Sequence, residues 1–213
     1  MVKLRHWVAA LGLCGGLAHG ASFSFTGAFS TDDQFQLFNF SLSSTSTVTL
    51  RTWSYAGGTN QAGTMIPQGG FDPWLSLYDS LGNLLQSVDN GTCLQVGTDS
   101  VTGACFDSFI SQSLGAGTYK LYLTQSDNGP AGTMLSDGFT QTGQPAFTAP
   151  FGCGNGTFCD ANGDNRAPKW ALDIDNVTSA SLPSSGVPEP GTITLLASGM
   201  AAIALLRRRR FKS

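Results

Sequence analysis

Aspartate is the one residue type in the body of the chain, residues 21–186, that is frequent enough to suggest acid–base or metal chemistry. The chain has 14 acidic residues; the single glutamate is Glu189, so the rest are aspartates, and both histidines, His6 and His19, precede the body. A body without histidine excludes Ser-His-Asp and Cys-His catalysis and histidine-based metal centres. Paired aspartates can hydrolyse glycosides, but here they lie in turn sequences, where aspartate caps backbone amides. We therefore expect no enzymatic activity, with an aspartate-dependent hydrolase kept as an alternative.

One aspartate-rich loop has the spacing of a calcium site. Asp160, Asn162 and Asp164 place oxygen ligands at the first, third and fifth positions of a loop, as an EF-hand-type loop does. The sixth position is Asn165 rather than glycine, and the twelfth is Ala171 rather than a bidentate glutamate. Calcium at this loop is therefore a hypothesis beside the simpler one of a structural turn. A second candidate cluster comprises Asp72, Asp79, Asp89 and Asn90.

The first 20 residues have the layout of a secretory signal peptide. Lys3 and Arg5 form a basic segment, residues 7–17 are apolar, and Ala18 and Gly20 are small residues at the −3 and −1 positions of a cleavage site. We expect a signal helix that is cleaved after Gly20. A retained membrane anchor is the alternative, although the apolar run is shorter than the ~20 residues that a span needs.

The C-terminal end combines three features in sequence. A Pro-Glu-Pro segment is followed by an apolar run over residues 191–206 and then by four consecutive arginines. A helix over that run is slightly short for a ~30 Å hydrocarbon core, and flanking arginines can extend it by snorkelling. The positive-inside rule places the arginines in the cytoplasm and the body outside. The residues concerned are Val187, Pro188, Glu189 and Pro190 in the first segment and Arg207, Arg208, Arg209 and Arg210 in the last.

This arrangement over residues 187–213 resembles the PEP-CTERM sorting signal. The resemblance implies that an exosortase, an inner-membrane transpeptidase of Gram-negative bacteria that make exopolysaccharide, recognises the tail and removes it. It implies secretion through the inner membrane to the cell surface or extracellular matrix, with membrane attachment through the C-terminal helix before processing. Exopolysaccharide is then a candidate partner, but the resemblance does not indicate what the body does.

Four cysteines follow the signal segment: Cys93, Cys105, Cys153 and Cys159. An even number in an exported chain predicts two disulfides, for which three pairings exist. Sequence proximity favours Cys93–Cys105 and Cys153–Cys159, each closing a glycine-rich loop. A four-cysteine zinc site is the alternative, but the chain has no CxxC motif.

The charge of the body differs sharply from that of the two ends. Seven of the eleven lysines and arginines lie in the terminal segments, so only Arg51, Lys120, Arg166 and Lys169 balance the thirteen aspartates of the body. Its net charge of −9 repels nucleic acid, and no nucleic-acid partner is expected.

Alternating apolar residues, 27 glycines and only 12% charged residues favour short strands joined by many turns. The change of parity between Leu37 and Phe38 indicates a bulge or a strand buried on both faces. About eight strands predict an all-β chain with a single β-sandwich or jelly roll over 22–182, between the signal peptide 1–20 and the linker and tail 183–213. The predicted strands lie near 23–29, 35–42, 47–51, 75–77, 119–123 and 170–174, with weaker candidates near 84–88, 106–112 and 133–139.

A second resemblance lies within the body. Residues 69–79 (GGFDPWLSLYD), 82–85 (GNLL) and 114–119 (LGAGTY) are similar to motifs of the bacterial pre-peptidase C-terminal β-sandwich and of PEP-CTERM exported proteins with a Gly-Gly-Phe-Asp-Pro segment. The resemblance implies a non-catalytic accessory domain of a kind that sometimes binds matrix or calcium. The cysteine-containing insertion at 92–106 departs from the family pattern.

These observations predict an exported, non-enzymatic protein with a structural or adhesive role. A calcium-dependent carbohydrate- or matrix-binding module is the main alternative. Exposure of Trp53, Tyr55 and Trp74 near the aspartate turns would favour that alternative, and their burial would weaken it.

Overall fold

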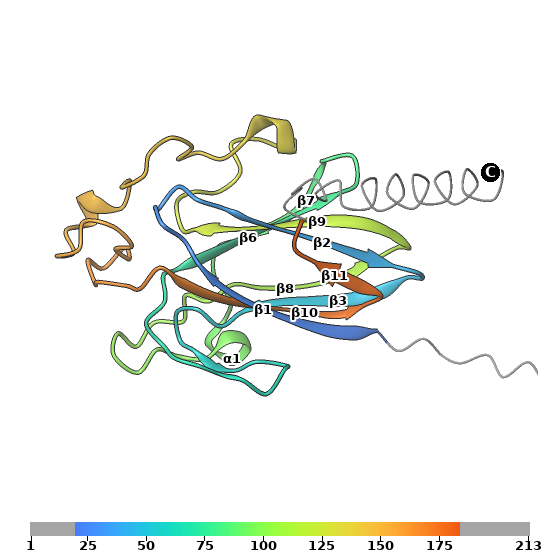
Figure 1. Cartoon of the computed structure of the whole chain (residues 1–213), viewed down its shortest axis with the longest axis horizontal. Coiled ribbons are helices and arrows are strands. Elements are labelled where there is room, and N and C mark those ends of the chain that lie inside the picture. The colour runs from blue at the N-terminus through green and yellow to red at the C-terminus, as the bar shows by residue number, and fades with distance from the viewer. Residues whose placement is uncertain (1–19, 184–213) are drawn as a thin grey trace, which may run out of the picture. The chain divides into compact units, whose positions relative to one another are not determined.

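A computed structural model describes residues 20–183, which form two facing β-sheets joined by short turns and a few long loops (Figure 1). Almost all of the predicted signal peptide, the predicted helix at 191–206 and the arginine cluster lie outside the described residues. The compact unit that contains the sandwich ends at Ser181.

One sheet has four strands in the order β1-β10-β3-β8, and the other has five in the order β11-β2-β9-β6-β7. All neighbouring strands in both sheets are antiparallel. The strands of the first sheet are β1 (Ala21–Ala28), β10 (Lys169–Val177), β3 (Ser46–Thr52) and β8 (Phe109–Leu114). Those of the second are β11 (Ser179–Ser181), β2 (Gln36–Leu42), β9 (Gly117–Gln125), β6 (Pro73–Asp79) and β7 (Leu84–Val88).

The remaining elements are small. A separate two-stranded ribbon joins β4 (Gly58–Thr59) to β5 (Met65–Ile66). Within residues 20–183, helical structure is limited to α1 (Cys93–Val96) and the 3-10 turns η1 (Leu135–Asp137) and η2 (Ala149–Phe151). The prediction of an all-β sandwich is therefore confirmed.

The core lies between the sheets and is built by the alternation that the sequence shows. Leu121 and Leu75 of the five-stranded sheet and Leu172 of the four-stranded sheet are completely buried in one apolar cluster. Successive strand residues point to opposite faces, so the intervening residues face outward. Burial of apolar surface, at about 25 cal/mol per Å², is the main force that holds the sheets together.

Strand β2 carries apolar residues on both faces near its beginning, but only its inner face is fully buried. Phe38 belongs to the core between the sheets, whereas Leu37 packs against a second cluster of Tyr78, Tyr122 and Phe139 on the outer face. The pairing of β2 with β9 has no register shift, so the parity change reflects two apolar faces rather than a bulge.

The predicted strand near 133–139 is wrong. This segment contains the 3-10 turn η1, in which the Asp137 carboxylate accepts a hydrogen bond from the Met134 amide at 2.9 Å. Its apolar residues Leu135 and Phe139 pack on the second cluster instead of extending a sheet. The sequence analysis also missed the β4–β5 ribbon and β11, whose Ser-Ala-Ser sequence carries no apolar alternation.

Candidate functional site

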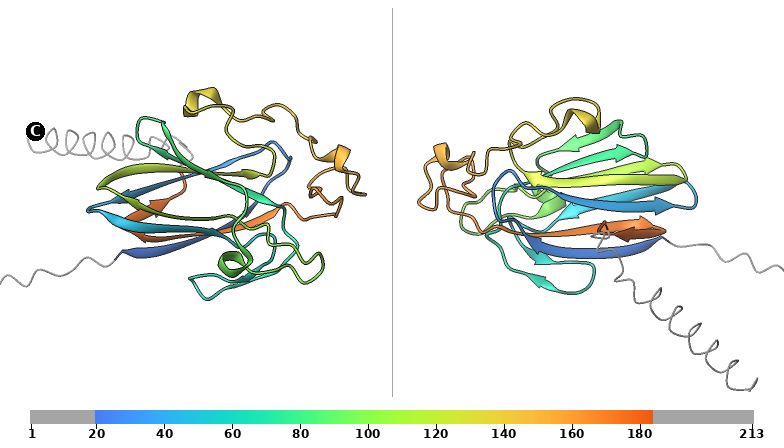
Figure 2. Two further views of the ribbon diagram at one scale, coloured as in Figure 1. Left: turned by 180° about the vertical axis from the view of Figure 1, so that it is seen from behind. Right: turned by 45° about the horizontal axis from the view of Figure 1, so that its top comes forward.

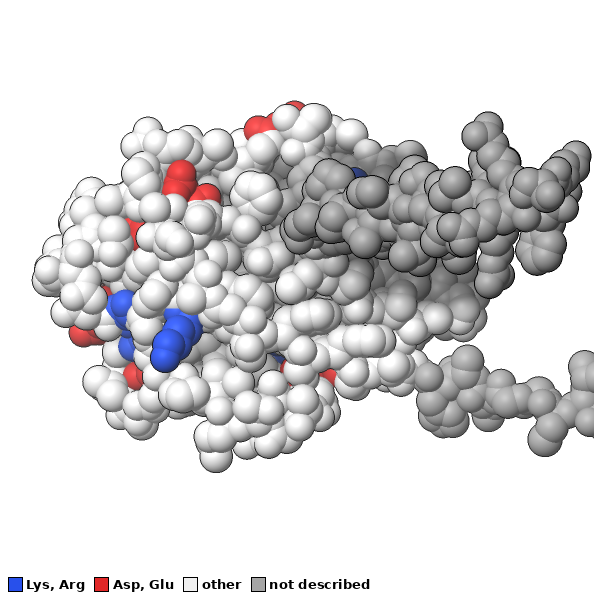
Figure 3. Space-filling model, in the orientation of Figure 1, with Lys and Arg blue, Asp and Glu red and all other residues white. Residues whose placement is uncertain are grey.

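The loops that carry most of the aspartates gather at one end of the sandwich, where the 126–168 segment, α1 and the β4–β5 ribbon lie (Figures 1 and 2). Charged side chains are sparse on the face shown in Figure 3, and most of that surface is uncharged. The chemistry of this end therefore depends on how its few charged groups are arranged.

Asp107 is completely buried and holds the chain that leaves β3. Its Oδ1 accepts hydrogen bonds from the Thr52 hydroxyl at 2.8 Å and from the backbone amides of Ser54 at 2.6 Å and Tyr55 at 3.1 Å, while its Oδ2 accepts one from the Ala56 amide at 2.8 Å. Burial raises the pKa of Asp107, and the hydrogen bonds oppose this effect. Such an acceptor-rich position indicates a structural group.

Arg166 is buried and crosses the same end of the sandwich. It forms an ion pair with Asp99 at 3.2 Å, stacks over the Tyr55 ring at 3.6 Å and donates hydrogen bonds to the carbonyls of Gly70 and Tyr55. The Tyr55 hydroxyl donates to Asp160 Oδ2 at 2.6 Å, and burial raises the pKa of Tyr55. These contacts tie four loop segments together.

The predicted calcium loop is organised around Asp160. This residue is buried, and its Oδ1 accepts hydrogen bonds from the backbone amides of Asn162 at 2.9 Å and Asp164 at 3.0 Å. The side chains of Asn162 and Asp164 are exposed. Within residues 20–183 no three acidic, histidine or cysteine side chains are grouped so as to hold a metal ion. Calcium at this loop stays a prediction.

The second predicted cluster divides into two kinds of carboxylate. Asp79 caps the β6–β7 hairpin by accepting from the amides of Leu81 and Asn83, and hydrogen bonds from Asn83 lower its pKa. Asp72 and Asp89, by contrast, each have a buried Oδ1 without a hydrogen-bond partner. Burial raises the pKa of both, that of Asp72 to well above its usual range.

The structure pairs the four cysteines as sequence proximity predicts. Cys93 is bonded to Cys105 with a Cα–Cα distance of 5.1 Å, and Cys153 to Cys159 with a distance of 5.4 Å. Both distances lie in the usual range for disulfides. The first disulfide ties α1 to the chain entering β8, and the second closes the loop before Asp160.

None of the three aromatic residues singled out from the sequence offers an open ring. Tyr55 is completely buried. Trp53 is partly buried, with the Arg51 guanidinium 3.5 Å from the centre of its ring and the glycine backbone of Gly58 close against the ring. Trp74 is also partly buried, and its indole N–H donates to the Ser87 hydroxyl at 2.5 Å. This arrangement weakens the alternative of a carbohydrate site built on these rings.

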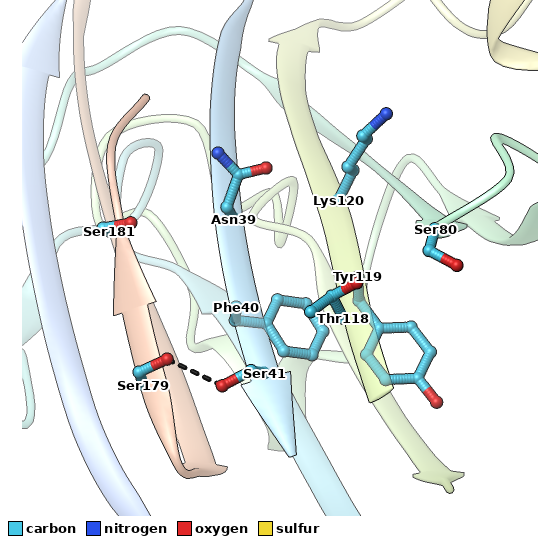
Figure 4. Close-up of a pocket in the computed structure, with 9 residues that line it drawn as sticks. All are labelled: Asn39, Phe40, Ser41, Ser80, Thr118, Tyr119, Lys120, Ser179 and Ser181. Atoms are coloured by element: carbon cyan, nitrogen blue, oxygen red, sulfur yellow. Dashed lines mark hydrogen bonds between the residues drawn. The ribbon is translucent and has the colours of Figure 1, made fainter. Parts of the chain in front are cut away.

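A groove on the outer face of the five-stranded sheet, lined mostly by residues with polar side chains, was not predicted from the sequence (Figure 4). It has a volume of about 300 Å³ and lies over β11, β2 and β9. Its polar side chains alternate with buried ones along these strands, a pattern that the sequence contains but that shows a site only once the strands are paired. We call it the Lys120 groove; its main polar side chains are Asn39, Ser41, Thr118, Lys120, Ser179 and Ser181.

Comparisons with known proteins give two kinds of match. Residues 186–210 match the PEP-CTERM protein-sorting motif. Five chains of solved structures match, among them the pre-peptidase C-terminal domain of a collagenase from Bacillus anthracis, with 10% sequence identity and a TM-score of 0.33 over 75% of this chain and 89% of that domain. No curated protein sequence matches the chain.

The matched motif contains the predicted sorting segment, residues 187–190, and the arginines 207–210, all outside the described residues. No helix within residues 20–183 is both long and apolar enough to span a bilayer. The motif implies recognition by an exosortase, export, and sorting to the cell envelope or surface. The chain is therefore a protein with a PEP-CTERM sorting signal.

Proposed function

We propose that this protein is a non-enzymatic structural or adhesive component of the cell surface or extracellular matrix, released from the membrane when an exosortase removes its tail. The observation that carries the proposal is that the aspartates of the body act as structural acceptors. Eight of them accept hydrogen bonds from backbone amides of their own or neighbouring loops. They are Asp32, Asp33, Asp79, Asp99, Asp107, Asp137, Asp160 and Asp173.

A carboxylate that holds a loop is not available for general acid–base catalysis, which requires access to a substrate atom. The linings of the cavities centred on Lys120, Thr45 and Trp170, all in the described part of the chain, contain no carboxylate. Two disulfides and a buried ion pair further stabilise the loops against exposure outside the cell. These features support a durable scaffold.

If an exosortase removes the tail, the C-terminus is processed and the mature body ends near residue 187. Mass spectrometry of protein extracted from the cell surface should show loss of the residues after about 187, and none of the arginines 207–210. Replacing Pro188, Glu189 and Pro190 by alanine should leave the precursor membrane-bound, whereas the control, Ser184 and Ser185 to alanine just before the matched motif, should be processed. An intact chain through Ser213 at the surface would contradict the proposal.

A calcium-dependent binding module is a second candidate, and the pair Asp72 and Asp89 favours it. Each has a buried carboxylate oxygen without a partner, and oxygen atoms of this kind are what Ca²⁺ binds. If calcium binds there, 1 mM Ca²⁺ should raise the melting temperature of the protein relative to EDTA, and Asp72→Asn should abolish the increase. An equal melting temperature in Ca²⁺ and EDTA would eliminate this candidate.

A further inference from the structure

The Lys120 groove has a regular arrangement that follows from strand pairing. The register places Ser181 beside Asn39 and Asn39 beside Lys120, so these three side chains form one row across β11, β2 and β9. Two residues along, Ser179, Ser41 and Thr118 form a second row. All six face outward, because residues two apart on a strand share a face.

The dimensions of this grid fit a short stretch of polysaccharide. Neighbouring strands lie ~4.8 Å apart and residues two apart on a strand ~6.8 Å apart. The two rows therefore cover roughly 10 Å by 7 Å of the sheet, enough for a disaccharide unit. Phe40 and Tyr119 occupy the intervening positions on these strands, and their rings stack with centres 5.3 Å apart on the core side of the sheet, so the grid itself consists of polar side chains.

The side chains of the grid have hydrogen-bonding capacity to spare. Between described residues, the only hydrogen bond that these six side chains form joins the hydroxyls of Ser41 and Ser179 at 2.7 Å. Hydroxyls both donate and accept, as sugar hydroxyls do, and the Asn39 amide offers a carbonyl acceptor and an NH₂ donor. The grid is therefore matched to a ligand rich in hydroxyl groups.

Lys120 gives the groove a local positive charge, because no aspartate is among the described residues that line it, although the body as a whole carries a net charge of −9. Of the four basic residues in the body, Arg166 is paired with Asp99 and Arg51 stacks on Trp53. Lys120 is half-buried, forms no ion pair with a described residue and lies among neutral hydroxyls. An ammonium group so placed favours an anion, and a charge-assisted hydrogen bond is about twice as strong as a neutral one.

We propose that the Lys120 groove binds an acidic polysaccharide through a uronate unit, whose carboxylate contacts Lys120 Nζ while the hydroxyls of its ring and of the adjoining sugar contact the grid. This rests on the proposed function, which places the protein at the cell surface or in the matrix, and it adds a ligand class and a site. A neutral glucan could form hydrogen bonds with the hydroxyls of the grid but would leave the Lys120 ammonium group without a partner of opposite charge.

The test measures binding of the full chain, purified in detergent, to immobilised polygalacturonate and to neutral dextran, with EDTA present to exclude calcium bridges. Lys120→Gln should weaken polygalacturonate binding about 10-fold, the size expected for loss of a charged contact. The matched control is Lys169→Gln, which removes the same charge from an exposed lysine in a different cavity and should change binding less than 2-fold. Asn39→Ala, which leaves the charge intact, should weaken binding about 3-fold.

Equal losses in the two lysine variants would overturn the proposal by showing non-specific charge attraction. Equal binding of dextran and polygalacturonate, or no binding of either, would also overturn it. Each of these failures leaves the proposed function standing if surface-extracted protein has the processed C-terminus. An unprocessed C-terminus defeats the proposed function whatever the groove binds.

Discussion

Asp107 and Asp72 are both buried carboxyl groups, and the fold treats them in opposite ways. Asp107 receives four hydrogen bonds, three of them from backbone amides in the chain that leaves β3. Asp72, which immediately precedes β6, has an Oδ1 without any partner, and its nearest charged influences are other aspartates, first of all Asp89. Burial of a carboxyl group therefore does not reveal its role; the donors around it do.

The pKa values show the same contrast. Burial raises the pKa of both groups, but amide donors counteract the rise at Asp107, whereas like charges on Asp89 and Asp107 add to it at Asp72. The fold therefore disfavours the charged form of both groups, but Asp107 holds a loop in place, whereas Asp72 has an Oδ1 that no donor satisfies.

The largest effect is expected at Asp107. Asp107→Ala leaves three backbone amides without an acceptor, two of them in buried residues, and each buried unsatisfied donor costs about 1–3 kcal/mol. The free energy of unfolding at pH 7 should fall by roughly 3–5 kcal/mol in urea titrations. Asp107→Asn, which keeps one acceptor oxygen, should lose clearly less. A loss below about 1 kcal/mol in the alanine variant would mean that water replaces the carboxylate.

A smaller effect of opposite sign is expected at Asp72. Asp72→Asn removes a charge that the fold disfavours, and each pKa unit corresponds to about 1.4 kcal/mol. The variant should therefore be more stable than the parent at pH 7 by about 1 kcal/mol or more.

The pH dependence of that difference follows from the sign of the shift. A raised pKa means that the folded chain holds the proton more tightly than the unfolded one, so the contribution of Asp72 to stability is present below its unfolded pKa of ~3.9. It is lost as the pH rises toward the folded value. The stability gap between Asp72→Asn and the parent should thus widen from pH 4 upward, in urea titrations with EDTA. A gap that stays constant with pH would show that Asp72 ionises normally.

Local patterns predict the parts of the molecule that depend on neighbours in sequence. Apolar alternation predicts β3, β6, β9 and β10, and proximity predicts both disulfides. The capping role of the aspartates also follows from their turn sequences. The prediction of a strand at 133–139 failed because the apolar residues of this segment cover the outer face of a sheet. Periodicity alone does not distinguish such a covering segment from a strand.

Long-range pairings lie beyond such patterns. The donors to Asp107 are more than 50 residues away, and Lys120 meets Asn39 and Ser181 only through the strand order β11-β2-β9. Ser179 and Ser181 carry no signal of a strand, yet they form one side of the groove. A site built from one lysine and several neutral polar residues on three strands is visible only in the folded chain.

The smallest effect is expected from removal of the Tyr55 hydroxyl, which donates to Asp160. Asp160 is a buried carboxylate whose donors come partly from its own loop and partly from across the fold. The backbone amides of Asn162 and Asp164 donate hydrogen bonds to Asp160 Oδ1, and the Tyr55 hydroxyl donates one to Asp160 Oδ2. Tyr55→Phe removes the distant donor, together with the longer 3.2 Å contact of the same hydroxyl with Thr102, and keeps the ring that stacks on Arg166. The free energy of unfolding should fall by only about 1 kcal/mol, close to the net value of a single hydrogen bond. Asp160→Ala, which also leaves both loop amides without an acceptor, should lower the free energy of unfolding further, and double-mutant analysis should assign the difference to the loop.

If Tyr55→Phe were as destabilising as Asp107→Ala, the tyrosine hydroxyl rather than the loop's own amides would be the main hydrogen-bond donor that stabilises Asp160. This carboxylate would then belong with Asp107 as a group whose donors are distant in sequence.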